Sequence, residues 1–221
     1  MSEDQRFSRR DLLKMSLATG GILLAGSGDP LLAQGAARVP TSEQAMGPFY
    51  PVLKPADQDA DLTVIQGKPG KSQGQVIYLL GRVMNQNGRP LPEARVEIWQ
   101  ANSFGRYTHP QDANPAPLDP NFQGYGVSTT DGEGRYRFKT IKPAPYPAAG
   151  DWVRPPHIHF QVTAGSTLLV TQMYFEGEPL NEKDRILRTA KDLGSLMTKL
   201  TPPTKDLDPG SLVAAWDIIL P

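Results

Sequence analysis

Frequent proline and glycine constrain the fold of this chain more than any other feature of its sequence. The 221 residues include 22 prolines and 21 glycines, while apolar residues still make up 38%. Proline disrupts the interior of helices and of central strands, and glycine favours turns, so long helices are disfavoured. The apolar content is that of a globular chain. The sequence therefore predicts an all-β domain that is rich in turns.

Charge and cysteine content exclude several classes of function. The 23 basic and 23 acidic residues balance, which argues against a nucleic-acid-binding protein, because such proteins normally carry a basic face. The absence of cysteine excludes disulfides, thiolate metal sites, iron–sulfur clusters and cysteine nucleophiles. Histidine is scarce, and its three positions are His109, His157 and His159.

The first 37 residues have the pattern of an export signal. Arg9 and Arg10 precede an uncharged stretch over residues 15–28, and small residues follow as far as Ala37. This stretch is shorter than the roughly 20 apolar residues that span a bilayer, so we expect no membrane span. A charged start, an apolar middle and a small-residue end are typical of signal peptides, and the arginine pair resembles the bacterial twin-arginine signal. We expect residues 1–37 to direct export to the periplasm; the alternative is an amphipathic N-terminal helix.

The remaining chain divides into an extended arm and one folded domain. Residues 38–74 have no sustained hydrophobic period and predict the arm. Short apolar or alternating runs then indicate strands. These runs lie at residues 75–83, 94–99, 135–141, 157–162, 168–175 and 212–220. Short strands with long connections predict an antiparallel β-sandwich over residues 75–221.

Three segments between the predicted strands carry other signals. Residues 131–134, Asp-Gly-Glu-Gly, predict a hairpin turn, because glycine accepts the positive φ that such turns need. Residues 181–200 are the one stretch with a helical pattern, opening with Asn181 as the cap. The loop over residues 100–125 contains four prolines, and long ordered loops usually carry function.

Two histidines on one predicted strand form the first candidate for a metal site. His157 and His159 are separated by Ile158, and alternate side chains of a strand point to the same face. The two imidazoles can therefore converge on one metal ion. The alternative is a polar strand face in which each imidazole has its own hydrogen-bond partner.

Tyrosine is the remaining candidate for a further ligand. Tyr107 lies at the start of the long loop, two residues before His109, and Tyr146 lies between Pro145 and Pro147, which restrict its backbone. For each tyrosine taken alone, a half-buried packing role is the better interpretation. A phenolate is a hard, anionic oxygen donor, so a site of histidine and tyrosine would favour a hard ion such as Fe(III).

Several motifs of this chain, in order and at compatible spacing, resemble a known enzyme family. They lie at residues 81–83, 96–101, 105–107, 118–122, 131–136, 142–147, 154–160 and 171–177. Residues 41–50 resemble the N-terminal arm of the same family. Together they are similar to the intradiol ring-cleavage dioxygenases, and most of all to the protocatechuate 3,4-dioxygenase branch, over nearly all of residues 41–221.

The resemblance implies a non-haem Fe(III) site with four protein ligands. Tyr107 and His157 would be its equatorial ligands, and Tyr146 and His159 its axial ligands, with a hydroxide as the fifth. A catecholic substrate would chelate the iron. O2 would then open its ring between the two hydroxylated carbons and give a muconate-type diacid.

The resemblance also assigns three catalytic positions, at Arg154, Tyr146 and Gln172. The permanent charge of Arg154 suits the negative charge that develops when oxygen attacks the ring. Tyr146 would accept a substrate proton, and Gln172 would neighbour the arginine. Without the resemblance, a surface salt bridge is the alternative role for Arg154.

The chain departs from the family pattern near the predicted site. Val153 separates Trp152 from Arg154, where the family's tryptophan commonly abuts the arginine, and the segment 147–153 is short. There is no long helical N-terminal region of the kind that dimerises catechol 1,2-dioxygenases. We expect the exported chain to act alone or as a homo-oligomer, on protocatechuate, catechol, hydroxyquinol or a larger catecholic compound.

Two other interpretations remain open at this point. The chain could be a non-catalytic exported β-sandwich that binds catechols or iron–catecholates without cleaving them. A zinc or copper site built on His157 and His159 alone is a third interpretation, but it leaves Tyr107 and Tyr146 unexplained.

Overall fold

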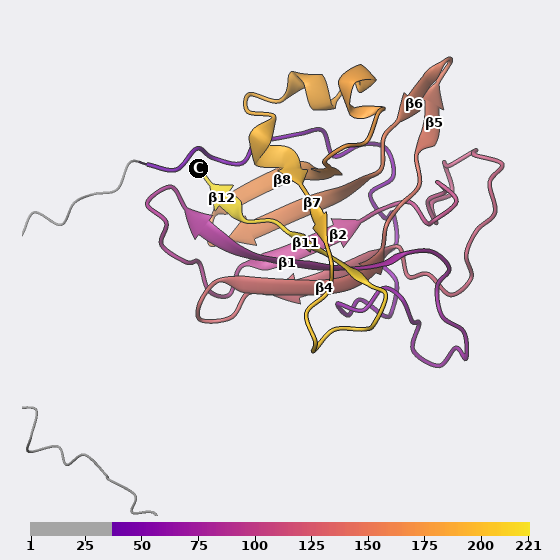
Figure 1. Cartoon of the computed structure of the whole chain (residues 1–221), viewed down its shortest axis with the longest axis horizontal. Coiled ribbons are helices and arrows are strands. Elements are labelled where there is room, and N and C mark those ends of the chain that lie inside the picture. Colours follow the sequence, from indigo (N-terminus) through magenta and orange to yellow (C-terminus); the bar gives the residue numbers. More distant parts are fainter. Residues whose placement is uncertain (1–36) are drawn as a thin grey trace, which may run out of the picture. The chain divides into compact units, whose positions relative to one another are not determined.

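The computed structural model describes residues 37–221 (Figure 1). The predicted signal segment 1–37 therefore lies outside the described residues except for its last position. Within the described part of the chain, no helix has the length and apolar character needed to cross a membrane.

Two five-stranded sheets and one small hairpin make up the regular structure (Figure 1). The first sheet contains β1 (Val76–Asn85), β4 (Arg135–Ile141), β10 (Leu200–Thr201), β11 (Leu212–Ala215) and β12 (Ile218–Leu220). The second sheet runs in the order β3 (Tyr125–Thr129), β2 (Arg95–Trp99), β7 (His157–Ala164), β8 (Thr167–Phe175) and β9 (Met197–Thr198). The hairpin pairs β5 (Tyr146–Ala149) with β6 (Trp152–Arg154).

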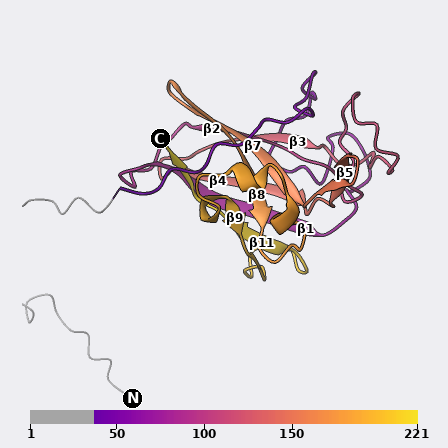
Figure 2. The same ribbon diagram turned by 90° about the horizontal axis from the view of Figure 1, so that it is seen from above.

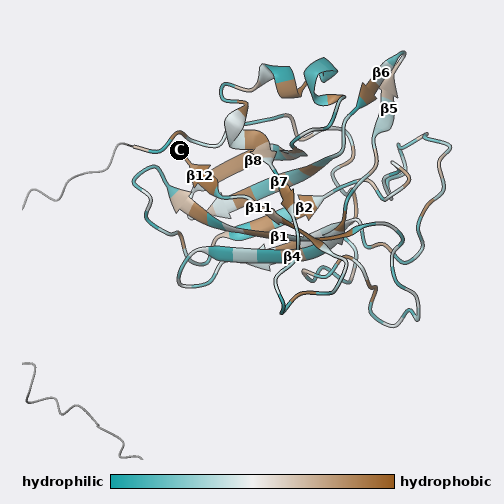
Figure 3. Ribbon diagram, viewed as in Figure 1, coloured by the Kyte–Doolittle hydropathy of each residue, from teal (hydrophilic) through white to brown (hydrophobic). Residues whose placement is uncertain are grey.

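The core lies between the two large sheets, and the alternation of the strands explains it. In β4, Tyr136 and Phe138 are buried while Arg135 and Arg137 are exposed. Tyr136 meets Phe160 of β7 across the core, with ring centroids 6.2 Å apart. Figure 3 shows the corresponding band of hydrophobic residues along the central strands. The predicted all-β sandwich is confirmed in this respect.

The prediction of a purely antiparallel sandwich is wrong. Both β11 and β12 run parallel to β1, and β9 runs parallel to β8. The single strand predicted at 212–220 is divided into β11 and β12. Trp216 and Asp217, which lie between them, hydrogen-bond to β1 outside the regular pairing of either strand. Trp216 N–H donates to Leu80 O, and the Asp217 carboxylate accepts from Arg82 N–H. A Cβ at Gly81 would overlap the Trp216 carbonyl oxygen, so glycine permits this close passage.

The predicted helix over 181–200 is wrong. The segment forms three short 3-10 helices, η2 (Asn181–Lys183), η3 (Leu187–Thr189) and η4 (Gly194–Leu196). Asn181 does not cap a helix; its side chain donates to Phe175 O. The carboxylates of Asp184 and Asp192 accept the backbone N–H groups two residues further on. Such local bonds compete with helical ones and divide the segment.

The glycine-rich segment 131–134 forms a turn, but the turn does not close a hairpin. Gly134 has φ +71° and donates its N–H to Asp131 O. The strands on either side belong to different sheets, because β3 pairs with β2 whereas β4 pairs with β1. The turn therefore carries the chain from one sheet to the other.

Residues 37–74 contact both sheets without forming a strand or helix of their own, and Leu62 N–H donates to Lys139 O of β4 in the first sheet. Gln44 N–H donates to Val170 O of β8, and Thr171 Oγ1 donates to Ser42 O. Figure 2 shows this indigo segment along the side of the fold that carries β2 and β7. It covers the face of β7 that points away from the core, so that both faces of that strand are buried.

Candidate metal centre and active site

Three polar atoms from the predicted ligand set converge at the outer face of β7. Tyr107 Oη lies 3.2 Å from His159 Nε2 and 3.5 Å from His157 Nε2, and the two Nε2 atoms are 3.2 Å apart. Tyr146 borders the same cluster, with its ring 5.4 Å from that of Tyr107 and 5.6 Å from that of His157. All four side chains are buried. The structure therefore brings together the four residues predicted as ligands.

The strand and its neighbours fix the direction of both imidazoles. Ile158 and Phe160 enter the core, so His157 and His159 point to the other face. His157 Nδ1 lies 2.7 Å from Pro155 O, a bond that places its proton on Nδ1 and leaves the Nε2 lone pair free. The ring of His159 stacks on Trp99, with centroids 4.9 Å apart and 11° between the planes.

The arm packs directly against His159 through a glycine. Gly47 has φ +74°, a conformation that disfavours a side chain. A Cβ at this position would lie 3.1 Å from His159 Cε1. The backbone of the arm therefore forms part of the wall around the imidazole.

Glu97 on β2 attaches the arm next to this site. Its buried carboxylate accepts hydrogen bonds from Tyr50 Oη and Lys54 Nζ of the arm, each at 2.9 Å. Tyr125 Oη and Arg95 Nε donate to the same carboxylate. Because these four donors surround one carboxylate, the arm and the second sheet share a single buried anion.

Tyr107 is held by a tightly turned loop. Its backbone N–H donates to Asp112 Oδ2 at 2.7 Å, and Asn102 Oδ1 accepts from Phe104 N–H and Arg106 N–H. Gly105 in this loop has φ +80°, and a Cβ there would overlap the carbonyl oxygen of Pro145. The loop that carries Tyr107 thus packs against the loop that carries Tyr146.

The ionisation of the cluster suits a cation. Burial raises the pKa of the Tyr107 phenol well above its usual value and also raises that of Tyr146. Burial lowers the pKa of His157 and of His159 well below the usual range. Without a cation, four neutral groups meet in a buried space, and the Nε2 atoms of the two imidazoles, each of which carries a lone pair when unprotonated, lie 3.2 Å apart. A metal ion would accept these lone pairs and stabilise the phenolates.

The donor set also identifies the kind of metal that fits. Among residues 37–221, no three histidine, cysteine, aspartate or glutamate side chains gather as a metal site. A four-ligand set at this position therefore requires both tyrosines, and two imidazoles with two phenolates suit a hard ion such as Fe(III).

Arg154 lies in a buried network beside the cluster. Its Nη2 donates to Gln172 Oε1 at 2.7 Å and to Tyr174 Oη at 2.9 Å, and its Nε donates to Asp184 Oδ2 at 2.7 Å. Gln172 Nε2 in turn donates to Ala45 O of the arm. The alternative of a surface salt bridge for Arg154 is wrong, because its side chain and that of Asp184 are buried.

The small hairpin connects this network to Tyr146. In the pairing of β5 with β6, Tyr146 lies opposite Arg154. The charge of Arg154 partly offsets the effect of burial on the Tyr146 pKa. One two-stranded unit therefore carries both a predicted ligand and the predicted catalytic arginine.

Sequence reasoning missed three residues of this site. Tyr174 could have been found, because it lies two positions after Gln172 and shares its face of β8. Trp99 lies in the motif at residues 96–101, but its stacking on His159 could not be predicted, and Asp184 lies in no motif; the partners of both in the site are distant in the sequence.

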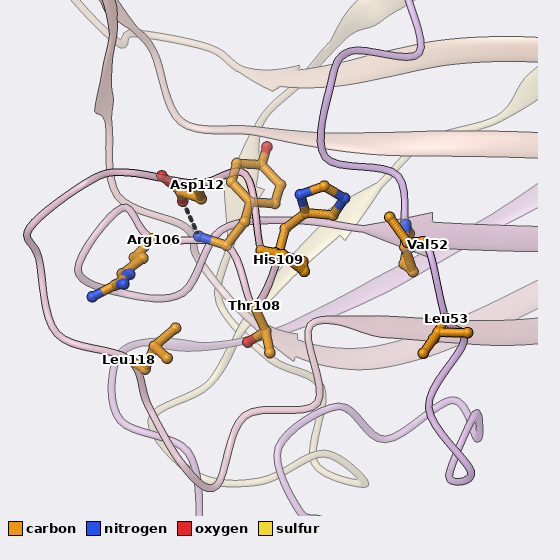
Figure 4. A pocket seen from close by; sticks show the side chains of 10 residues that line it. Val52, Leu53, Arg106, Thr108, His109, Asp112 and Leu118 are labelled. Carbon is orange, nitrogen blue, oxygen red and sulfur yellow. Dashed lines mark hydrogen bonds between the residues drawn. The ribbon is translucent and has the colours of Figure 1, made fainter.

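His109 is not part of the hydrogen-bonded cluster but lies next to it, because His109 and Tyr107 line one cavity. It lines a cavity of about 520 Å³ together with Val52, Leu53 and Leu118 (Figure 4). Its Nδ1 accepts the Gln111 N–H at 3.2 Å. Among the described residues, it makes no hydrogen bond to the four predicted ligands.

Comparisons with known proteins identify the family of this two-sheet sandwich, which carries two buried tyrosines and two buried histidines together at one outer face. A family model described as Dioxygenase matches residues 45–221. The chain belongs to the intradiol ring-cleavage dioxygenase family.

Individual relatives carry related names. The chain is 45% identical over 158 residues to the protocatechuate 3,4-dioxygenase beta chain of Burkholderia cepacia, covering 68% of this chain and 67% of that one. It is 31% identical over 181 residues to a catechol 1,2-dioxygenase of Candida albicans, covering 76% of this chain and 57% of the relative. It is 31% identical over 203 residues to a hydroxyquinol 1,2-dioxygenase of Corynebacterium glutamicum, covering 81% of this chain and 63% of the relative. The chain thus spans less than two thirds of the latter two.

Solved structures share the fold. The dioxygenase domain of a dioxygenase carbohydrate-binding protein fusion from Streptomyces sp. SirexAA-E superimposes with a TM-score of 0.61 at 25% identity, covering 82% of this chain and 98% of that one. Catechol 1,2-dioxygenase from Acinetobacter sp. ADP1 superimposes with a TM-score of 0.62 at 26% identity, covering 81% of this chain and 62% of that one.

Proposed function

We propose that this protein is a non-haem Fe(III) dioxygenase that cleaves a catecholic ring between its two hydroxylated carbons with O2, giving a muconate-type diacid. The observation that carries this proposal is the convergence of Tyr107 Oη, His157 Nε2 and His159 Nε2 within 3.5 Å, with Tyr146 beside them. The family to which the chain belongs is known to use non-haem iron.

Tyr107, Tyr146, His157 and His159 would hold the iron. When bound, ferric iron supplies a Lewis acid that withdraws electron density from a catecholate and so prepares the ring for O2. His157 is held as a ligand by its Nδ1 bond to Pro155 O, which keeps Nε2 unprotonated. His159 is held by the flat stack on Trp99.

Two further side chains act on the substrate in this proposal. The Tyr146 phenolate accepts a proton from a substrate hydroxyl at its Oη. Arg154 carries a permanent positive charge in a buried site, where it stabilises anionic oxygen that develops during the reaction. Gln172 acts through Arg154 by accepting its Nη2 hydrogen bond at 2.7 Å.

We propose a protocatechuate-like compound as the substrate. The most similar of the three relatives described above is named a protocatechuate 3,4-dioxygenase beta chain. Other relatives are named for catechol and hydroxyquinol, and these are the competing substrates.

We further propose that the protein is exported to the bacterial periplasm and acts as a single chain or a homo-oligomer. The support is the pair Arg9 and Arg10 ahead of a short uncharged stretch. Replacing both arginines with lysine should leave the protein in the cytoplasmic fraction, and unchanged export would contradict the twin-arginine assignment.

Oxygen uptake tests the proposed reaction. Iron-loaded protein should consume one O2 per molecule of protocatechuate, catechol or hydroxyquinol and release a ring-opened diacid. Binding of these catechols without O2 uptake would favour the non-catalytic binding module instead. Comparison of kcat/KM among the three compounds then identifies the preferred substrate.

A further inference from the structure

A buried ion pair joins Arg154 to the segment that follows β8. Asp184 is fully buried, and its Oδ2 accepts the Arg154 Nε–H at 2.7 Å. Its Oδ1 accepts the backbone N–H groups of Ile186 and Leu187 at 2.8 and 2.7 Å. A buried carboxylate is tolerated only when hydrogen bonds and a counter-charge compensate for lost solvation. Asp184 meets this condition with one oxygen for the backbone and the other for Arg154.

The guanidinium of Arg154 is fixed from two directions. Asp184 occupies Nε, whereas Gln172 and Tyr174 occupy Nη2. Because the guanidinium is planar, bonds at two of its nitrogens determine the position of the third. Among the described residues, Nη1 makes no hydrogen bond of good geometry, although the guanidinium interacts with the nearby Tyr146 phenol, so this donor is available to a ligand bound beside Tyr146.

Asp184 contributes a negative charge, which Gln172 and Tyr174, the two neutral partners of Arg154, do not. It is the one carboxylate hydrogen-bonded to this guanidinium among the described residues, and it lies in the turn between η2 and η3. Its position is fixed by the turn itself through Ile186 and Leu187. The turn therefore fixes the position of Asp184, and Asp184 in turn fixes the position of the Arg154 guanidinium.

We propose that Asp184 is the positioning residue for Arg154, holding its guanidinium so that Nη1 is presented to the oxygen atoms of the reacting substrate. This inference rests on the proposed dioxygenase function. Asp184 does not itself contact substrate, and its effect on turnover is exerted through Arg154. The competing explanation is an ion pair that only attaches the segment 181–196 to the sandwich.

Asp184→Asn separates these two roles. The amide keeps an oxygen for the N–H groups of Ile186 and Leu187, so the turn is retained, but it places an N–H donor against Arg154 Nε. Displacement of a catalytic group by about 1 Å can cost about 100-fold in rate. We expect kcat to fall by roughly 10- to 100-fold, with KM within about threefold, because Arg154 acts after binding.

Asp192→Asn is the matched control. Asp192 lies in the same segment, and its Oδ1 accepts Gly194 N–H at 3.0 Å in a similar local bond. Its side chain makes no ion pair with an arginine among the described residues. Asp192→Asn removes one negative charge from the same segment and should leave kcat unchanged within about twofold.

A double-mutant cycle tests whether Asp184 acts through Arg154. In an Arg154→Ser background, Asp184→Asn should lower kcat by less than about twofold, because the group that it positions is absent. An equal decrease in both backgrounds would overturn the proposal and assign Asp184 a role independent of Arg154.

A second measurement uses metal-free protein and does not depend on activity. In nuclear magnetic resonance spectra, the Arg154 Nε–H signal, assigned by its loss in Arg154→Ser, should exchange slowly in the wild type and in Asp192→Asn. It should exchange rapidly in Asp184→Asn. If Asp184→Asn does not fold, the exchange rate of the Arg154 Nε–H in the wild type is the test, and rapid exchange in the wild type overturns the proposal. A wild-type protein with a slowly exchanging Arg154 Nε–H but no oxygenase activity would refute the proposed function. The ion pair between Asp184 and Arg154 would still be supported.

Discussion

The imidazole of His159 lies flat on the indole of Trp99, with ring centroids 4.9 Å apart and planes 11° from parallel. Tyr50 of the arm meets the same indole edge-on at 4.9 Å. Trp99 is therefore packed between a proposed iron ligand and the arm. This relationship links the placement of residues 37–74 to the geometry of the metal centre.

Replacement of Trp99 by a smaller residue should lower the stability of the fold and weaken iron binding. Trp99→Leu removes the surface on which His159 stacks, and truncation of a buried aromatic typically costs about 3–5 kcal/mol. We expect a decrease of about 2–4 kcal/mol in the free energy of unfolding, since leucine refills part of the volume. Iron should also be lost faster to a chelator. Trp99→Phe keeps an aromatic surface and should retain iron nearly as well as the wild type; equal iron retention in Trp99→Leu would contradict this role.

The loop glycine next to the ligands should resist substitution for a steric reason. Gly105 and Gly177 both have φ +80°, but only at Gly105 would a Cβ overlap another atom, the Pro145 carbonyl oxygen. Gly177→Ala should cost about 1 kcal/mol of unfolding free energy from backbone strain alone. Gly105→Ala should cost about 3 kcal/mol and lower iron affinity, because the Tyr107 loop must move away from the Tyr146 loop. Equal losses of unfolding free energy in the two variants, measured by denaturant unfolding, would show that the close approach of Gly105 to Pro145 does not affect stability.

Glu97 should make the stability of the protein depend on acid pH. Burial by itself raises the pKa of Glu97, but hydrogen bonds from Tyr125, Lys54 and Arg95 outweigh this and lower the pKa to about 2. A folded-state pKa below the unfolded value of about 4.5 means that the unfolded chain binds more protons between these two values. The contribution of Glu97 is therefore complete above about pH 5 and is lost as the pH falls towards 2.

Denaturant unfolding of metal-free protein between pH 5 and 2 measures this effect. The wild type should lose stability more steeply than Glu97→Gln over this range. Replacement of the exposed Glu182 by glutamine should leave the slope unchanged. Parallel slopes for wild type and Glu97→Gln would contradict the assignment of a low pKa to Glu97.

Removal of one proposed ligand should weaken iron binding. Tyr107→Phe keeps the ring and its packing but reduces the protein ligands from four to three, so iron content after dialysis against a chelator should fall strongly. Tyr78→Phe removes a buried phenol on the first sheet, far from the ligands in the fold, and should leave iron content unchanged. Full iron retention in Tyr107→Phe would remove this tyrosine from the ligand set.

Local pattern predicted β1, β2, β4, β7 and β8, whereas Tyr107 and Tyr146 entered the proposed ligand set only through the resemblance to the family. Alternation in Arg135–Ile141 and the spacing of His157 and His159 depend on neighbours in sequence, and both appear in the structure. The parallel pairing of β11 and β12 with β1 depends on contacts more than 100 residues away, and no local signal contains it. The segment 181–200 forms 3-10 helices because side-chain hydrogen bonds of Asp184 and Asp192 divide it, and helical periodicity in the sequence does not predict such bonds.

The same distinction explains which parts of the site were missed. Arg154 could be assigned from its place before His157, but its partner Asp184 lies 30 residues further on in an irregular segment. His109 follows Tyr107 by two residues in the sequence. The structure places both in the lining of one cavity with Val52 and Leu53, and His109 makes no hydrogen bond to the proposed ligands among the described residues.

The visible absorption spectrum of the iron-loaded protein, before and after anaerobic addition of protocatechuate, tests the central claim most directly. Ligation by Tyr107 and Tyr146 predicts a broad phenolate-to-Fe(III) charge-transfer band that shifts to longer wavelength when the catechol chelates the metal. A colourless protein after iron reconstitution, or one that binds stoichiometric zinc in its place, would contradict the proposed ferric centre.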